Sequence, residues 1–317
     1  MTFDCVCHLA KEQTENPSCS EQWVGQYNWR IAVGKKKEAE QLRELWKARY
    51  LQNRQAPGEA LVSREWQDIL KLSPTLETLR ESDTLPAGSF FIHCTFTLQK
   101  PYLSKDDNDF HITDNPLVRE KVFRWPMVRS SGWKGALWHA LWQSGHLEDD
   151  TQRCRIFGKT LDNDTGRSGR LYLYPTFFAE SDLEIINPHD REKRVGTKPI
   201  LLECVPIEAK GTFTLLYVPF DLIGEQVAAD LQLIAAGIRA MMTTYGFGAK
   251  TSSGFGLAKD SLSDGCLCVA GPVIPEIEPS EQQRLPHSPT AMRSFASWDE
   301  LVARAAELSR WLVEGGV

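Results

Sequence analysis

The sequence Phe90-Phe91-Ile92-His93-Cys94-Thr95-Phe96-Thr97-Leu98 is the first stretch that favours a β-strand, because it is aromatic and β-branched with partial alternation. The elements predicted after it are a helix entered at Ser130, a strand at 171–175, a hairpin of 199–205 with 211–220, and a helix at 227–243. The order strand, helix, strand, strand, helix is that of a ferredoxin-like unit. We therefore predict an α+β fold.

Further helices flank this unit. Residues 35–52 place Leu42, Leu45 and Trp46 at helical spacing, and a second helix is predicted from Ser63. A last helix, capped at Ser297, carries an apolar stripe of Leu301, Ala305, Leu308 and Leu312. The predicted regions are a helical N-terminal extension at 1–88, a ferredoxin-like domain at 89–260, and a Pro-rich linker with a C-terminal helix at 261–317.

Composition limits the classes of function. The chain has 317 residues, of which 42% are apolar and 25% charged, as in a soluble globular protein. No run approaches the ~18 apolar residues of a membrane span, so we expect a cytoplasmic protein without a membrane partner. Eight scattered cysteines favour a reducing compartment. The net charge of −6 argues against a generally basic coat, so any nucleic-acid site must be local.

The stretch Gly246-Phe247-Gly248-Ala249-Lys250-Thr251-Ser252-Ser253-Gly254-Phe255-Gly256 is typical of a loop that binds anions. Glycines let the main chain approach a ligand, and N–H groups, hydroxyls and a lysine suit phosphate oxygens. Walker A and dinucleotide spacings do not fit, because the loop follows a helical pattern instead of preceding one. The predicted contacts are Gly246, Gly248, Lys250, Thr251, Ser252, Ser253, Gly254 and Gly256. A glycine-rich hairpin without a ligand is the alternative.

Two further segments suit an anion. Ser130 and Ser131 are good N-cap residues, and Lys134 falls in the first helical turn, where phosphate binds readily. The alternative is a capped amphipathic helix whose Lys134 faces water. The polar segment 187–198 contains Arg191 and Arg194, which could follow a nucleic-acid backbone or simply be solvated.

A long acidic loop at 104–114 leads into Asp114-Asn115-Pro116, where the proline biases Asn115 to extended geometry. Loops of this length in compact domains are more often functional than idle. Possible zinc ligands are Cys5, Cys7, His8 and Cys19. Since Cys-x-Cys lacks the usual two-residue gap, we do not expect a structural zinc site there. Cys266 and Cys268 are too isolated to indicate a metal site.

Three separated segments together resemble one family, the RAMP superfamily, and in particular the backbone subunits of type III CRISPR effector complexes. The segments are Asp114-Asn115-Pro116, the helix start Pro126-Met127-Val128-Arg129-Ser130-Ser131-Gly132-Trp133-Lys134-Gly135, and the glycine-rich stretch 246–256. The resemblance covers residues 90–257. Trp133 and Trp138 depart from it, because they stand where the family commonly has leucine and arginine.

The resemblance implies an RNA-recognition-motif-like domain that holds CRISPR RNA along its backbone and assembles with other CRISPR-associated subunits. It also implies contact with a complementary target RNA. In members that cut target RNA, the aspartate of the Asp-Asn-Pro segment is required, so Asp114 is the implied catalytic residue, with Mg²⁺ or Mn²⁺ as the metal. A stabilising turn around Asp114 is the structural alternative.

Two other functions stay open at this point. One is an endoribonuclease that matures precursor CRISPR RNA, for which His139 and His146 are available. The other is an end-capping subunit that binds RNA and neighbours but cuts nothing, which suits the acidic net charge and the long N-terminal extension. The Asp-Asn-Pro segment favours the backbone-subunit interpretation over the processing enzyme.

Overall fold

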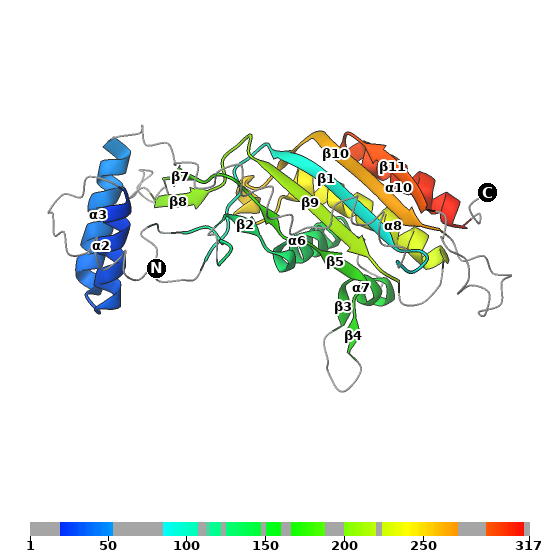
Figure 1. Ribbon diagram of the computed structural model, residues 1–317, viewed down its shortest axis with the longest axis horizontal. Coiled ribbons are helices and arrows are strands. Elements are labelled where there is room, and N and C mark those ends of the chain that lie inside the picture. The colour runs from blue at the N-terminus through cyan, green and yellow to red at the C-terminus, as the bar shows by residue number, and fades with distance from the viewer. Residues whose placement is uncertain are drawn as a thin grey trace.

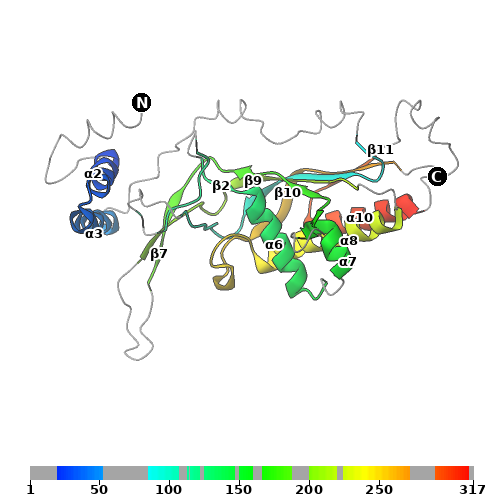
Figure 2. The same cartoon turned by 90° about the horizontal axis from the view of Figure 1, so that it is seen from below.

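The computed structural model describes residues 20–52, 85–106, 113, 115–121, 125–146, 150–159, 166–187, 200–219, 224–271 and 290–313. Its centre is a five-stranded antiparallel sheet in the order β11-β10-β1-β9-β5. Figure 1 shows the sheet flanked at one end by the paired helices α2 and α3, and Figure 2 shows the helices α6, α8 and α10 on one face of the sheet. The fold is therefore a layer of helices on an antiparallel sheet.

The helices are α2 (Ser20–Ala32), α3 (Lys36–Gln52), α6 (Ser130–Gln143), α7 (Asp150–Phe157), α8 (Gly224–Ala240) and α10 (Trp298–Val313). The sheet strands are β1 (Phe90–Leu98), β5 (Leu171–Leu173), β9 (Lys210–Tyr217), β10 (Ala258–Ala270) and β11 (Thr290–Phe295). The short paired strands are β2 (Met127–Val128) with β6 (Thr176–Phe177), β3 (Gly158–Lys159) with β4 (Arg167–Ser168), and β7 (Asp182–Ile186) with β8 (Ile200–Cys204). A π-helical turn (Met241–Tyr245) extends α8, and a 3-10 turn (Thr251–Ser253) follows it.

The ferredoxin-like prediction is confirmed. The elements β1, α6, β5, β9, α8 and β10 follow one another as β-α-β-β-α-β, and the four strands lie in the order β10-β1-β9-β5. Alternate residues of β1 and β9 face the helices, because side chains of a strand point to its two faces in turn. The buried residues on this face include Phe90, Ile92, Phe96, Phe213, Leu215 and Tyr217.

The predicted C-terminal helix also forms, and its stripe of Leu301, Ala305, Leu308 and Leu312 is buried in the main core. The predicted linker before it is wrong for residues 261–270 and 290–295, which form strands, whereas 272–289 lie outside the described residues. β10 continues to Ala270, and β11 pairs with it, so much of 261–295 belongs to the sheet. Leu267 and Val269 of β10 enter the core. The strand was missed because, apart from Leu262, its remaining residues are polar, small or cysteine.

The predicted hairpin of 199–205 with 211–220 is also wrong, because β8 pairs with β7 and β9 pairs with β1. Between β8 and β9 the chain turns at Pro206 and at Glu208, which has φ of +68°. The turn is tied to β1 by the bond from the Glu208 N–H to the Leu98 carbonyl. The apolar face of β9 is thereby directed to the core.

Helices α2 and α3 form a separate small core of Trp23, Tyr27, Ala39 and Leu42. Trp46 packs at its edge, whereas Leu45 is exposed instead of sharing the buried face. The helix predicted from Ser63 lies outside the described residues. Among the helices that the structure describes, none is both long and apolar enough to cross a membrane.

Candidate nucleic-acid interface

The segment that follows β1, residues 101–104, connects the three motifs, and we call it the connector. Its main chain holds both ends of the glycine-rich stretch. The Gly256 N–H donates to the Pro101 carbonyl at 2.8 Å, and the Ala249 N–H donates to the Leu103 carbonyl at 2.7 Å. The glycine-rich stretch is therefore docked on the end of the central strand and cannot move independently of the sheet.

The base of the loop is closely packed. Gly248 has φ of +91° and Gly256 has φ of +69°, a left-handed region that glycine adopts without a steric penalty. A methyl group on Gly248 would overlap the Leu103 carbonyl oxygen, and one on Gly256 would overlap the Phe247 carbonyl oxygen. These two glycines are therefore required by the approach of main chain to main chain, with or without a ligand.

The tip of the loop, residues 250–254, has a different character. Lys250, Ser252 and Ser253 are exposed, and a methyl group on Gly254 would meet nothing within 4 Å. The tip is closed by bonds from the Ser253 N–H to the Lys250 carbonyl and from the Gly254 N–H to the Thr251 carbonyl. In the described part of the chain, no main-chain bond uses the N–H groups of Lys250, Thr251 or Ser252. The tip thus offers a lysine, hydroxyls and amide donors to an anion.

An aromatic cluster joins the loop to helix α6. Phe247 is 1% exposed, and its ring lies 4.5 Å from the Trp133 ring and 5.6 Å from the Tyr102 ring, measured between centroids. The Trp133 indole also donates a hydrogen bond to Thr176 Oγ1 at 3.0 Å. Trp133, where the family commonly has leucine, therefore fills the space between the helix start and the glycine-rich stretch.

The start of α6 differs from the prediction. Arg129 is the N-cap residue and makes no side-chain capping bond, while Ser130 and Ser131 are the first two helical residues. Ser131 is exposed and Ser130 half-buried, so both hydroxyls lie beside the positive end of the helix. Partial burial lowers the pKa of Lys134 in the same turn. The helix start therefore keeps its phosphate-binding chemistry and adds exposed Arg129, which sequence reasoning left out of the site.

Tyr102 ties the helix start to the loop base. Its hydroxyl donates to the Met127 carbonyl at 3.2 Å, and its ring lies directly under Gly248. Burial raises the pKa of Tyr102 to about 12, although a bond with Ser104 and the charge of Arg129 act in the opposite direction.

The Asp-Asn-Pro segment is anchored on the same connector. The Asn115 side-chain amide donates to the Ser104 carbonyl at 2.6 Å, and Asn115 forms a parallel bridge with Leu202 of β8. Glu203 accepts the Leu117 N–H at 2.8 Å and pairs with Arg119. Asn115 is thereby fixed, but Asp114 itself lies outside the described residues, as do Arg191 and Arg194 between β7 and β8.

A small apolar cluster brings the glycine-rich stretch against the same hairpin. Leu103, Leu202 and Cys204 are buried together, and Ala249 and Phe255 pack on them. Since Leu202 is also the bridge partner of Asn115, both Asn115 and the glycine-rich stretch adjoin this cluster. The three motifs, distant in sequence, meet around the connector.

The described residues do not by themselves form a site for Mg²⁺ or Mn²⁺, which bind several oxygen ligands. Near Asn115, the Glu203 carboxylate is already occupied by Arg119 and by the Leu117 N–H. Across the described ranges, no three His, Cys, Asp or Glu side chains gather as a metal site. Cys5, Cys7, His8 and Cys19 all lie outside these ranges, so zinc binding there stays untested.

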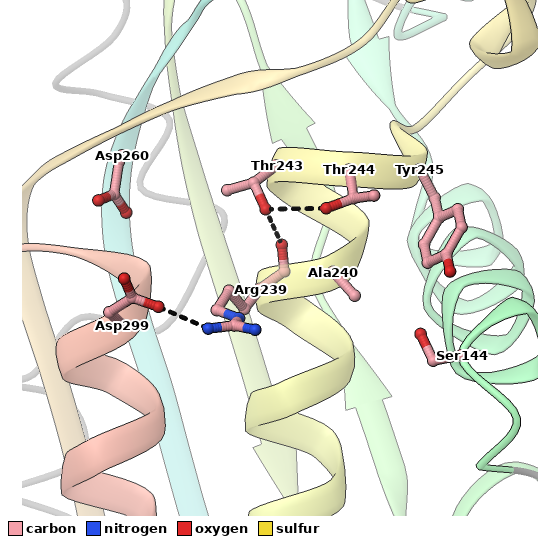
Figure 3. A pocket seen from close by; sticks show the side chains of 8 residues that line it. All are labelled: Ser144, Arg239, Ala240, Thr243, Thr244, Tyr245, Asp260 and Asp299. Atoms are coloured by element: carbon pink, nitrogen blue, oxygen red, sulfur yellow. Dashed lines mark hydrogen bonds and ion pairs between the residues drawn. The ribbon is translucent and has the colours of Figure 1, made fainter.

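Polar side chains also line a pocket beside the end of α8. A pocket of about 440 Å³ is lined by Ser144, Arg239, Ala240, Thr243, Thr244, Tyr245, Asp260 and Asp299 (Figure 3). Arg239 is paired with Asp299 at 2.6 Å, and Asp260 adds a second carboxylate, so the pocket does not suit an anion. His139 is exposed in the second half of α6, and His146 is exposed just after the helix ends. Neither lies at the start of the helix.

Comparison with known proteins was made by sequence and by structure. A family model described as RAMPs, the RAMP superfamily, matches residues 30–259. A chain in the cryo-EM structure of the type III-B Cmr-beta bound to cognate target RNA is similar with a TM-score of 0.48 and 16% identity, over 84% of this chain and 98% of that chain. A chain in the crystal structure of the Csm3-Csm4 subcomplex in the type III-A CRISPR-Cas interference complex is similar with a TM-score of 0.42 and 14% identity. This match covers 69% of this chain and 95% of that chain. No curated protein matches the chain.

Proposed function

The chain belongs to the RAMP superfamily, and from this membership we propose that it binds the backbone of CRISPR RNA as a subunit of a type III CRISPR ribonucleoprotein. The proposal rests chiefly on one observation, the convergence of the loop and the start of α6 on the connector. Both elements carry cationic side chains and hydroxyls, and both stand on rigid neighbours. A complementary target RNA and other CRISPR-associated subunits are the further partners we propose.

The chemistry of the interface suits a ligand of variable sequence. Lysines, hydroxyls and main-chain N–H groups contact phosphate and sugar, and such contacts position a strand without reading its bases. In RNA-guided recognition, base pairing between guide and target reads the sequence. The net charge of −6 also agrees with a binding site restricted to this local group of residues.

The first test is binding of single-stranded RNA by the purified chain, followed by fluorescence anisotropy over a range of salt concentrations. We expect little sequence preference. Lys134→Ala together with Lys250→Ala should weaken binding and reduce the slope of log affinity against log salt by about 0.7 for each phosphate that is no longer neutralised. Replacement of both lysines by arginine should retain the slope, because the charge is kept.

Lys36→Ala with Lys37→Ala is the matched control, since it removes two exposed lysines at the start of α3, outside the interface. It should leave the slope close to that of the unaltered chain. If the Lys134 and Lys250 variant keeps both affinity and slope, the proposed interface is wrong. If the chain binds no single-stranded RNA and joins no CRISPR-associated partner, the proposed function is wrong as well.

We further propose that Asp114 contributes to cutting of target RNA in the assembled complex. The support is its position, since Asp114 directly precedes Asn115, which is fixed beside the glycine-rich stretch. In the complex supplied with Mg²⁺ or Mn²⁺, Asp114→Ala should abolish cutting at the one position that this subunit serves. Guide and target binding should be retained.

Asp114→Asn is the companion variant, because an amide can keep a turn-forming hydrogen bond while the charge is removed. Loss of cutting in both variants, with binding intact, supports a catalytic carboxylate. Cutting that persists at every position in both variants means that Asp114 is structural, and an end-capping role then describes the subunit better. Sequencing of cleavage products gives the position directly.

A further inference from the structure

Helix α6 carries a pair of tryptophans on its outer face that the interface described above does not use. Trp138 is 37% exposed and Trp142 56% exposed, whereas Trp23, Trp125, Trp133 and Trp298 are all buried. The Trp138 and Trp142 rings are parallel within 4°, with centroids 6.4 Å apart. Two large apolar rings held in parallel at the surface form a platform on which a planar group can stack.

The platform is continuous with the cationic start of the helix. Lys134, Trp138 and Trp142 follow at intervals of four, so they line one side of α6. The sequence of α6, Ser-Ser-Gly-Trp-Lys-Gly-Ala-Leu-Trp-His-Ala-Leu-Trp-Gln, contains no acidic residue, although the chain as a whole carries a net charge of −6. This side of the helix therefore suits a polyanion that also has planar groups.

Polar side chains beside the rings supply hydrogen-bonding groups. His139 is exposed, with its ring 6.1 Å from the Trp142 ring, and its Nε2 lies 3.3 Å from the Gln143 amide nitrogen. The distance along the helix from Lys134 to Trp142 is about 12 Å at 1.5 Å per residue.

We propose that Trp138 and Trp142 stack on bases of the single-stranded RNA whose phosphates contact the start of α6. The inference rests on the proposed function and adds base contacts to it. Lys134 then holds a phosphate, and the following nucleotides pass along α6 with their bases on the two rings. Stacking of this kind tolerates any base, because every base has a π-face. The platform therefore adds affinity without sequence preference.

The test compares single-stranded RNA with an RNA of the same length that has abasic sites, both measured by anisotropy with the full chain. Trp138→Ala with Trp142→Ala should lower affinity for the normal RNA by roughly 5- to 150-fold for each base that is no longer stacked. The salt slope should not change, because the phosphate contacts stay in place. The double variant should no longer distinguish normal from abasic RNA. Trp138→Phe with Trp142→Phe should restore most of the affinity.

Leu45→Ala is the matched control, because Leu45 is a large apolar side chain on another helix with similar exposure, 57%. It should leave RNA affinity unchanged. The thermal unfolding midpoint of each variant shows that the helix is intact, as expected for replacement of exposed side chains. A drop in RNA affinity that the phenylalanine variant does not restore would overturn the stacking proposal.

The outcomes separate this inference from the proposed function. If the unaltered chain binds RNA with the expected salt slope but the tryptophan variants bind equally well, only the platform is wrong. If the tryptophan variants instead change self-association or capture of a CRISPR-associated subunit, measured by native mass spectrometry, the pair is a protein contact and the stacking proposal is wrong. If the unaltered chain does not bind RNA, both the stacking proposal and the proposed function are wrong.

Discussion

The base and the tip of the loop both contain glycine, but glycine has a different physical role in each. At the base, Gly248 and Gly256 lie where a methyl group would overlap main-chain oxygens. At the tip, a methyl group on Gly254 would meet nothing within 4 Å, and Lys250 extends into solvent. The same residue type is therefore a packing requirement at one end and an open, left-handed turn position at the other.

This difference changes how a glycine-rich stretch is interpreted. The ligand-free alternative describes the base well, because its glycines are already explained by contact with the connector and with Phe247. The anion-binding interpretation applies to the tip, where amide donors stay available among the described residues. A count of glycines cannot separate the two roles, whereas the surroundings of each glycine can.

The largest effect is expected at the base. Gly256→Ala places a methyl group against the Phe247 carbonyl at φ of +69°, so backbone strain and steric overlap add. We expect the free energy of unfolding to fall by about 3 kcal/mol or more, measured by urea denaturation. Gly254→Ala at the tip has φ of +83° but open space, so it should cost about 1 kcal/mol.

The two glycine variants should differ in their affinity for RNA. Gly254→Ala leaves the tip in place and should keep most RNA affinity, whereas Gly256→Ala displaces the stretch from the connector and should abolish it. Equal decreases of stability in the two variants would contradict the division into base and tip. Circular dichroism of each variant distinguishes local disturbance of the loop from global unfolding.

Much of the fold could be predicted from the sequence. The β-branched strand at 90–98 and the apolar stripe of the last helix gave correct elements, because periodicity reports which face is buried. Strand pairing could not be predicted in the same way. β8 and β9 are both apolar and close in sequence, yet β8 pairs with β7 and β9 pairs with β1 and β5, with a turn of positive φ at Glu208 between them.

The candidate site could also be predicted only in part. Residue types at the loop and at α6 pointed to an anion, but the connector that brings them together carries no motif. Tyr102 and Leu103 act through main-chain carbonyls and ring packing, which leave little trace in one sequence. Exposed Arg129 stood inside a recognised segment and was overlooked because serine is the usual N-cap residue.

A smaller effect on stability is expected at Tyr102, whose ring packs against Gly248 at the base of the loop. Its pKa in the folded chain is about 12 instead of the ordinary 10, because burial disfavours the phenolate. The neutral phenol therefore stabilises the fold fully below pH 10, and this contribution declines as the pH rises from 10 to 12. The decline should reach about 1.4 kcal/mol at pH 11, since one pKa unit corresponds to that free energy.

Tyr102→Phe isolates the pH-dependent contribution of the Tyr102 phenol. The other groups that ionise at alkaline pH are the same in the variant and in the unaltered protein. Near pH 8 the variant should be less stable by about 1 kcal/mol, since it lacks the hydrogen bond to the Met127 carbonyl. Because phenylalanine has no phenol to ionise, the difference should shrink above pH 10 and change sign close to pH 11. Urea denaturation between pH 8 and pH 11.5 measures it, and a difference that stays constant over this range would show that burial does not raise the pKa of this phenol.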